Sequence, residues 1–364
     1  MPRRTVTMLA STLVLIALLC VGALTKVPYA EMSPGPTVNT LSSPGGKPVL
    51  QISGHKTYPT SGHLNMVTVR VTQADYRMNI VEAVYGWLAH DDVVVPHDTL
   101  YPNGQTEQQS SQENAEEFSQ SQESAKVAAL KELHIPVVSH VNVASVLKNS
   151  PAEGKLHAGD LIEAVDGTKV TRPDQVAGLV TRHKPGQDVV FTVVPAKTAA
   201  AAKKAGKEPS GSRKVTVKTA LSHDSGKSRA IVGIAAGTDH TFPFDIDIKL
   251  ADVGGPSAGM MFSLGLIDEL TPGSLTGGKF VAGTGTIDDK GTVGPIGGIA
   301  MKMIGARDAG ARYFLAPSDN CKEAAADTPK GLTLVRVKNL SDAKASVDKI
   351  RTGDTAGLPS CSAG

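Results

Sequence analysis

A serine inside a glycine-rich turn is the first residue of this sequence that could do chemistry. Ser257 lies in the run Gly-Gly-Pro-Ser-Ala-Gly at 254–259, after a strand-like stretch. Apolar residues then recur at helical spacing, at Met260, Met261, Leu264, Ile267 and Leu270. Ser257 is therefore expected at a helix N-terminus, where unpaired backbone N–H groups and the helix dipole could stabilise an oxyanion. The alternative is that Ser257 only caps the helix, the commonest use of serine there.

A lysine on a second helix could activate this serine. The pattern predicts a helix from about Ile299 to Ala309, with Lys302 on the same face as Ile299, Ala306 and Ala309, whereas Arg307 lies off that face. Burial on an apolar face would lower the pKa of a lysine and leave part of it neutral, as a general base requires. The alternative is that Lys302 extends along the apolar surface and keeps its ammonium group in water.

Other catalytic arrangements find little support. No His/Asp pair stands in an obvious frame beside Ser257, and the sequence contains neither CxxC nor HExxH. We therefore expect no metal and no organic cofactor.

Three separated motifs together carry a family resemblance. The segments GGPSAG at 254–259, AGTGTI at 282–287 and GPIGGIAMK at 294–302 resemble, in order and spacing, the proteolytic domain of the Lon family. The resemblance implies a Ser257/Lys302 catalytic dyad, with Thr284 hydrogen-bonded to the lysine and backbone N–H groups around Gly255–Ala258 as the oxyanion site. It also implies that the domain can form hexameric rings.

Two departures from the family pattern stand beside these matches. Ala300 replaces the first lysine of the helix motif. Gly254 replaces the acidic residue that usually precedes GPS, with Asp252 two residues earlier. These departures affect the expected local geometry and leave the dyad in place.

The middle of the chain has a different pattern. Ser150-Pro151-Ala152, the run Gly159–Ile162, the Asp166-Gly167 turn and a helix over Pro173–His183 resemble a PDZ domain of bacterial proteases. Such a fold binds an extended peptide on a strand edge beside a helix. The edge is predicted at Val141–Val146, and Val176 and Val180 of the helix are expected to face the groove. The predicted peptide-binding residues are Val141, Val143, Val146, Val176 and Val180. The alternative is a small β-sandwich whose groove is filled.

The N-terminus sets the expected compartment. Arg3 and Arg4 precede 21 uncharged residues that end before Lys26, about the length of one hydrocarbon core as a helix. The positive-inside rule then predicts a single-pass signal-anchor at residues 5–25, with the lipid bilayer around it and the body outside the cytoplasm. The rival is a cleaved signal peptide. On that side Cys321 and Cys361 could form a disulfide, or remain two free thiols.

Composition and boundaries complete the prediction. A net charge of +2 over 364 residues gives no electrostatic case for nucleic-acid binding. The fold class is predicted as α+β. The predicted N-terminal part consists of a stub at 1–4, the anchor at 5–25, and a turn-rich stalk with the first strands at 26–61. An α/β segment follows at 62–134, and then a PDZ domain at 135–222, which contains a solvated basic loop at 196–214. The Lon-like domain is predicted at 227–350 and a tail at 351–364. Segment 62–134 resembles the first part of a Lon proteolytic domain, which would make the PDZ domain an insertion.

Taken together, these features predict a membrane-anchored serine endopeptidase with a peptide-binding PDZ domain. No GxxxxGK[ST] motif is present, so we expect it to work without ATP on unfolded or exposed segments. The alternatives are an inactive PDZ scaffold of the cell envelope, and an esterase or amidase using the same dyad.

Overall fold

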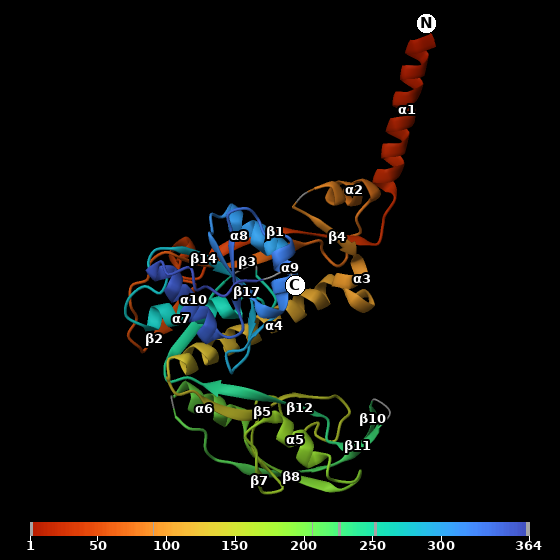
Figure 1. Ribbon diagram of the computed structural model, residues 1–364. Coiled ribbons are helices and arrows are strands. Elements are labelled where there is room, and N and C mark those ends of the chain that lie inside the picture. Colours follow the sequence, from red (N-terminus) through yellow and green to blue (C-terminus); the bar gives the residue numbers. More distant parts are fainter. Residues whose placement is uncertain (1–2, 90, 206, 225–226, 251–252, 362–364) are drawn as a thin grey trace. The chain divides into compact units, whose positions relative to one another are not determined.

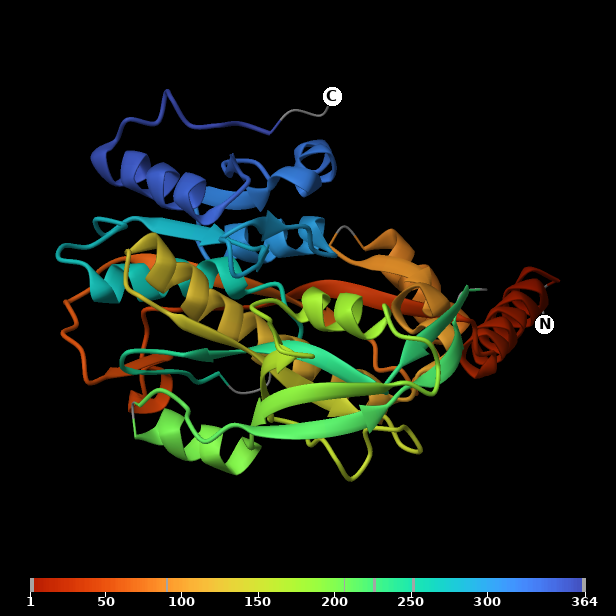
Figure 2. The same ribbon diagram turned by 90° about the horizontal axis from the view of Figure 1, so that it is seen from below.

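The computed structural model describes residues 3–89, 91–205, 207–224, 227–250 and 253–361. The chain forms two compact units, and each is described by itself. The first contains residues 1–134 and 246–364, and the second contains residues 135–245. Figures 1 and 2 show the helices and strands of both units.

A mixed six-stranded sheet organises the first unit. Its strand order is β18-β17-β14-β3-β1-β4. Their bounds are β1 Tyr29–Asn39, β3 His63–Val71, β4 Val93–Pro96, β14 Phe280–Gly283, β17 Tyr313–Pro317 and β18 Thr333–Val337. Strand β14 runs parallel to both β3 and β17. Because β3 pairs with β14, the segments before and after residues 135–245 share one sheet.

Helices pack around this sheet. They are α4 (Glu107–Glu132), α7 (Gly259–Leu270), α8 (Ile299–Asp308), α9 (Cys321–Ala326) and α10 (Leu340–Thr352). Helix α7 is buried almost all round, which explains its nearly continuous apolar sequence. Helix α8 packs through Ile299, Met303 and Ala306 into a core that includes Val67 and Phe314.

The remaining elements of the first unit are short, apart from α1. They are α1 (Arg3–Leu24), η1 (Pro44–Gly46), β2 (Leu50–Ser53), α2 (Ile80–Leu88), α3 (His97–Leu100), η2 (Pro102–Gly104), β13 (Asp245–Ile248), β15 (Thr286–Ile287), β16 (Val293–Gly294) and η3 (Ser318–Asn320). A disulfide joins Cys321 to Cys361 and holds the tail, so the alternative of two free thiols is wrong.

The turn-rich stalk predicted within residues 26–61 is also wrong in part, because Tyr29–Asn39 form β1. Proline and glycine within this segment indicated turns, yet β1 pairs with β3 on both sides of a register shift between Pro34 and Thr37. Gly35 and Pro36 lie within that irregularity, where a missing N–H breaks no ladder bond. Strand β4 pairs with Tyr29–Met32, before the prolines.

The second unit is a sheet with the order β12-β5-β6-β8-β9, with β7 paired to β6. Its elements are β5 (Val138–Val146), β6 (Leu161–Val165), β7 (Thr168–Lys169), α5 (Pro173–Val180), β8 (Asp188–Val194), α6 (Ala196–Lys204), β9 (Arg213–Lys218), β10 (Ala220–Asp224), β11 (Lys227–Ile231) and β12 (Ile234–Thr241). The unit continues to Asp245, beyond the predicted boundary at 222, because β12 pairs with β5 along its whole length.

The basic loop predicted at 196–214 is wrong in its first half. Alanines and lysines there form α6, which follows Pro195 and packs Ala199 against Leu161 and Val194. High intrinsic helix propensity explains this outcome, since alanine and lysine are both good helix formers.

Candidate active site

Ser257 lies in the loop between β13 and α7, immediately before Ala258. Ala258 is the N-cap residue of α7, and it makes no side-chain capping hydrogen bond. The interpretation of Ser257 as a helix cap is therefore wrong.

Helix α4 holds the turn that carries this serine. The Gly255 amide donates to the Asn114 carbonyl oxygen at 2.9 Å, and the Ser121 hydroxyl donates to the Pro256 carbonyl oxygen at 2.8 Å. Gly255 has φ +78°, a conformation that favours glycine. A Cβ on Gly259 would lie 2.8 Å from both Ile287 and Ser121, so the helix start also requires glycine.

These contacts change the expected oxyanion site. The Gly255 amide already has an acceptor, so it is not a free donor in this conformation, contrary to the prediction. The amides of Ser257 and Ala258 come next in the turn. Asn114 and Ser121 were missed by sequence reasoning, because nothing in a long polar helix marks two residues that face a turn some 140 positions later.

The loop after β14 fixes Ser257 from the other side. The Gly285 amide donates to the Ser257 carbonyl oxygen at 2.9 Å. The Thr284 hydroxyl donates to the same oxygen at 3.0 Å. The second predicted motif therefore contacts the first directly.

Lys302 completes the cluster from α8. Its Nζ lies 2.6 Å from Ser257 Oγ and 3.2 Å from Thr284 Oγ1. The side chain is 3% exposed. The Nζ thus points into the site, and the alternative in which it reaches water is wrong.

Burial changes the proton affinity of this lysine. Desolvation disfavours the ammonium form and lowers the pKa of Lys302 from 10.5 to about 8. About one Lys302 side chain in ten is then neutral at pH 7. A neutral amine at hydrogen-bond distance from a hydroxyl has the geometry of a general base and its nucleophile.

The predicted apolar face of α8 agrees with the structure except at its end. Ile299, Lys302 and Ala306 are buried, whereas Ala309 is the exposed C-terminal cap. Arg307, predicted to lie off this face, donates to the Lys330 carbonyl oxygen.

A cleft of about 300 Å³ opens onto the serine and the lysine. Its other walls are Pro36, Met66, Thr68, Val69, Arg70, Val253, Gly254 and Ala258. Strands β1 and β3 supply the first five, so the segment predicted as a stalk lines the cleft. Asp252 lies outside the described residues. Within the part of the chain that the structure describes, no group of three His, Cys, Asp or Glu side chains could hold a metal ion.

The second unit contains a groove, in a different place from the one predicted. Strand β5 is covered by β12 along Val138–Val146, so the predicted edge is occupied. Val141 and Val143 are buried in the core, and Val146 packs against it. The end strand of the sheet is β12, which comes from sequence beyond the predicted domain.

The groove of about 470 Å³ runs between α5 and the segment that leads into β12. Val176 and Val180 line it, as predicted, opposite Val232, Gly233 and Ile234. The predicted strand edge is therefore wrong, and Val176 and Val180 stay predictions for peptide binding that now lie on a groove.

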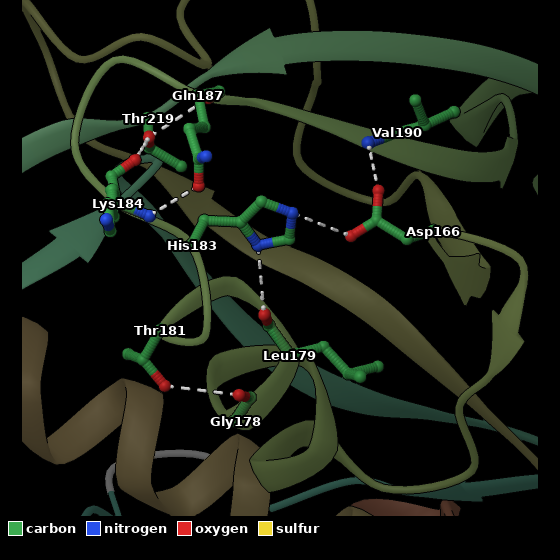
Figure 3. Close-up of polar contacts among 9 residues, drawn as sticks. All are labelled: Asp166, Gly178, Leu179, Thr181, His183, Lys184, Gln187, Val190 and Thr219. Atoms are coloured by element: carbon green, nitrogen blue, oxygen red, sulfur yellow. Dashed lines mark hydrogen bonds and ion pairs between the residues drawn. The ribbon is translucent and has the colours of Figure 1, made fainter.

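Polar contacts hold the α5 wall of this groove (Figure 3). His183 Nδ1 lies 3.3 Å from the Leu179 carbonyl oxygen, and His183 Nε2 lies 3.3 Å from Asp166 Oδ2. Asp166 Oδ1 accepts the Val190 amide at 2.8 Å. The end of α5 is thus tied to the Asp166-Gly167 turn and to β8.

Comparison with known proteins identifies both parts of the chain. Residues 249–346 match the Lon protease (S16) C-terminal proteolytic domain, and residues 111–198 match the PDZ domain family. Lon protease 1 of Bacillus subtilis is 37% identical over 92 residues, which cover 24% of this chain and 12% of that protein. Lon protease of Roseiflexus castenholzii is 32% identical over 136 residues, covering 35% of this chain and 16% of that protein. The chain thus spans about an eighth of the curated relatives it matches.

Solved structures match part of the chain. The PDZ domain of an SdrC-like protein from Listeria innocua is 24% identical, with a TM-score of 0.21, over 28% of this chain and 98% of that one. The second domain of the Listeria protein Lin2157 is 26% identical, with a TM-score of 0.20, over 27% of this chain and 83% of that one.

The family matches confirm the predicted domain types. The chain contains a PDZ domain and a Lon-type serine-peptidase domain, together with an apolar N-terminal helix, in a mixed α and β fold. The PDZ match begins inside α4 and ends inside α6, so it leaves out β12.

Proposed function

We propose that this protein is an ATP-independent serine endopeptidase in which Ser257 is the nucleophile and Lys302 is the general base. The observation that carries this proposal is the 2.6 Å contact between Ser257 Oγ and the buried Lys302 Nζ, with the pKa of that lysine lowered to about 8. A scaffold that only binds partners does not need such an arrangement, which supports the enzyme over the inactive alternative.

The reaction proceeds through an acyl-enzyme. Neutral Lys302 takes the proton from Ser257 Oγ, and the oxygen attacks the substrate carbonyl carbon. The carbonyl oxygen becomes negative and accepts hydrogen bonds from the Ser257 and Ala258 amides at the start of α7. When the tetrahedral intermediate collapses, the C–N bond breaks and Lys302 gives its proton to the leaving amine. Water then attacks the ester carbonyl carbon while Lys302 takes a proton from it, and the ester C–O bond breaks as Lys302 returns that proton to Ser257 Oγ.

Thr284 is proposed as a positioning residue. Its hydroxyl donates to the Ser257 carbonyl oxygen and accepts from Lys302 Nζ. This double contact fixes the lysine relative to the serine and leaves Nζ aimed at Oγ.

The substrate is proposed to be an unfolded or exposed segment of an extracytoplasmic or membrane protein. The cleft of about 300 Å³ fits a few side chains of an extended chain. The groove beside α5 is proposed to bind a peptide by adding a strand to β12. The absence of a GxxxxGK[ST] motif from these 364 residues supports action without ATP.

The location is proposed from α1. This helix spans Arg3–Leu24, contains an 18-residue stretch with a mean hydropathy of 2.4 and is mostly exposed. With Arg3 and Arg4 at its start, it would anchor the protein in the cell membrane with the body outside the cytoplasm. Assembly into a homo-oligomer, a hexamer by analogy with Lon-type domains, belongs to the same proposal.

The test uses the full-length protein in detergent micelles, without ATP, on unfolded casein. Wild type is compared with Ser257→Ala, Lys302→Met and the exposed-lysine control Lys322→Met. We expect cleavage by wild type and Lys322→Met alone. Equal cleavage by all four proteins would show that Ser257 and Lys302 do not catalyse the reaction. No cleavage by any of the four, with all of them folded, would favour the alternative of an inactive PDZ scaffold.

A further inference from the structure

Helix α2 carries its apolar residues on the outside. Its sequence is IVEAVYGWL, and the residues that face the protein are small, Ala83 and Gly86. The large apolar side chains are exposed, from 38% to 76%, at Ile80, Val81, Val84, Tyr85, Trp87 and Leu88. A surface helix of a soluble protein shows the opposite distribution, so this face requires a covering.

A capping box stabilises the N-terminus of α2. Asn79 and Glu82 form a capping box, in which each side chain accepts the backbone amide of the other residue. A side chain at Gly86 would lie 2.6 Å from Val94, so α2 packs tightly on β4. The exposed face therefore belongs to a fixed element.

The end of α1 is joined directly to α2 (Figure 1). The Ile80 amide donates to the Thr25 carbonyl oxygen at 3.2 Å, and the Val27 amide donates to the Met78 carbonyl oxygen at 2.9 Å. A Cβ built on Gly22 would lie 3.3 Å from Val81. These contacts place α2 beside the last turn of α1, where a spanning helix leaves the hydrocarbon.

The side chains around this junction are those found at membrane interfaces. Tyr85 and Trp87 are aromatic with a polar atom, and Lys26 Nζ lies 5.2 Å from the centre of the Tyr76 ring. Tryptophan, tyrosine and lysine concentrate at the headgroup level. Glu82 is the one charged residue of α2, and it accepts the Tyr76 hydroxyl at 2.6 Å.

We propose that α2 lies in the headgroup and acyl boundary of the bilayer leaflet from which α1 emerges, with its exposed apolar face in the lipid. The inference rests on the membrane anchor proposed above. Lipid is favoured over a second copy of the chain because α2 adjoins the end of the proposed anchor α1, where Val81 lies against Gly22 and the Ile80 amide donates to the Thr25 carbonyl oxygen. The protein would then contact the membrane through two elements and hold its body at the bilayer surface without a flexible stalk.

The sequence provides its own probe, because Trp87 is the single tryptophan. The full-length protein is reconstituted in phosphatidylcholine vesicles, with and without bromine on the acyl chains, and flotation first shows whether it is membrane-bound. We expect a blue-shifted Trp87 emission and at least threefold quenching by brominated lipid. The control is W87F/L147W, which moves the tryptophan to an exposed position in the second unit and should not be quenched.

Three further outcomes separate the alternatives. A protein that does not float would overturn both the anchor and the interfacial helix. A protein that floats, with Trp87 accessible to iodide and unquenched by brominated lipid, would overturn the interfacial helix alone. A blue-shifted but unquenched Trp87 that becomes water-exposed in single-copy nanodiscs would assign the face to a second copy instead.

A pair of variants tests the face itself. Y85E/L88E places two charges on exposed positions of α2, and L221E places one on an exposed position of the second unit. We expect Y85E/L88E to float as wild type does while its Trp87 quenching falls several-fold, and L221E to change neither. Unchanged quenching in Y85E/L88E would contradict the proposal.

Discussion

The two functional regions of this molecule are built in different ways. At the Ser257 site, the proposed catalysis depends on three side chains that loops and one helix bring within hydrogen-bond distance. At the groove beside α5, the proposed peptide binding depends on which strand forms the edge of a sheet. The first kind of site is specified by residue type, and the second by strand order.

The difference explains which predictions succeeded. The lysine must lie on an apolar helix face and the serine in a glycine turn. Both requirements restrict the residue types around these two positions. An edge strand needs only an unpaired backbone, which any sequence offers. The following predictions test this contrast, from the largest expected effect to the smallest.

Replacing either member of the dyad should abolish hydrolysis while peptide binding persists. Ser257→Ala and Lys302→Met are each expected to lower kcat/KM by at least about 10³-fold, because nucleophile and base act as a unit. Steady-state hydrolysis of a fluorogenic peptide measures this loss, and isothermal titration measures peptide binding to the groove. Loss of both hydrolysis and peptide binding in one variant would show that the Ser257 site and the groove do not function independently.

Removing Lys302 should also stabilise the fold at neutral pH. The pKa of Lys302 is about 8 in the folded state and 10.5 when unperturbed, so the unfolded state binds the proton more tightly. Burial of the charged Lys302 therefore lowers the free energy of unfolding by its full amount below pH 8, and this loss disappears above about pH 10.5. Lys302→Met should raise the free energy of unfolding at pH 7 by up to about 3 kcal/mol.

Urea titration of Lys302→Met and of Lys322→Met at pH 7 and pH 10 measures this difference. The increase in the free energy of unfolding caused by Lys302→Met should be smaller at pH 10 than at pH 7. Lys322→Met, the exposed-lysine control, should show no such increase. A gain that does not depend on pH would mean that burial of charge is not its cause.

Activity should rise with pH where binding does not. Because neutral Lys302 is the proposed active form, kcat/KM is expected to increase about tenfold from pH 7 to pH 9, with an apparent pKa of about 8. Peptide affinity at the groove should change little over the same range. A flat rate profile would contradict the role of Lys302.

Thr284→Val should weaken the site without removing it. The variant keeps the shape and loses the hydroxyl that contacts both Lys302 and the Ser257 carbonyl oxygen. We expect kcat to fall by about ten- to a hundredfold, with KM nearly unchanged and the apparent pKa of the rate profile shifted. Thr284→Ser should restore most of the activity, whereas failure of Thr284→Ser would indicate a packing role alone.

Filling the groove should produce the smallest effect, and only on peptide binding. Ala177 is an exposed residue of α5 that lines the groove, whereas a side chain at Gly178 would meet no neighbour. We expect Ala177→Trp to weaken peptide binding about tenfold, and Gly178→Trp to leave it unchanged. Both should hydrolyse a short fluorogenic peptide at the wild-type rate, and equal loss in the two variants would mean that the groove lies elsewhere.

The sequence predicted helices α7 and α8 and the motifs beside them well, because burial and turn geometry restrict residue type there. It predicted β1 as a stalk, since proline and glycine indicate turns unless a register shift in the sheet accommodates them. It placed the end of the PDZ domain before β12, because a strand that pairs with β5 from about 95 residues away leaves no local signal. Asn114 and Ser121 were missed for the same reason, since their contacts with the serine turn are long-range.

Trapping the acyl-enzyme tests the central claim most directly. Full-length wild type, Lys302→Met and Lys322→Met are mixed with a peptidyl p-nitrophenyl ester, quenched in acid and digested, and the adduct is located by mass spectrometry. The account predicts one acyl group on the peptide that contains Ser257, formed rapidly in wild type and Lys322→Met and at least about 10³-fold more slowly in Lys302→Met. An adduct on another residue, or equal rates in all three proteins, would contradict it.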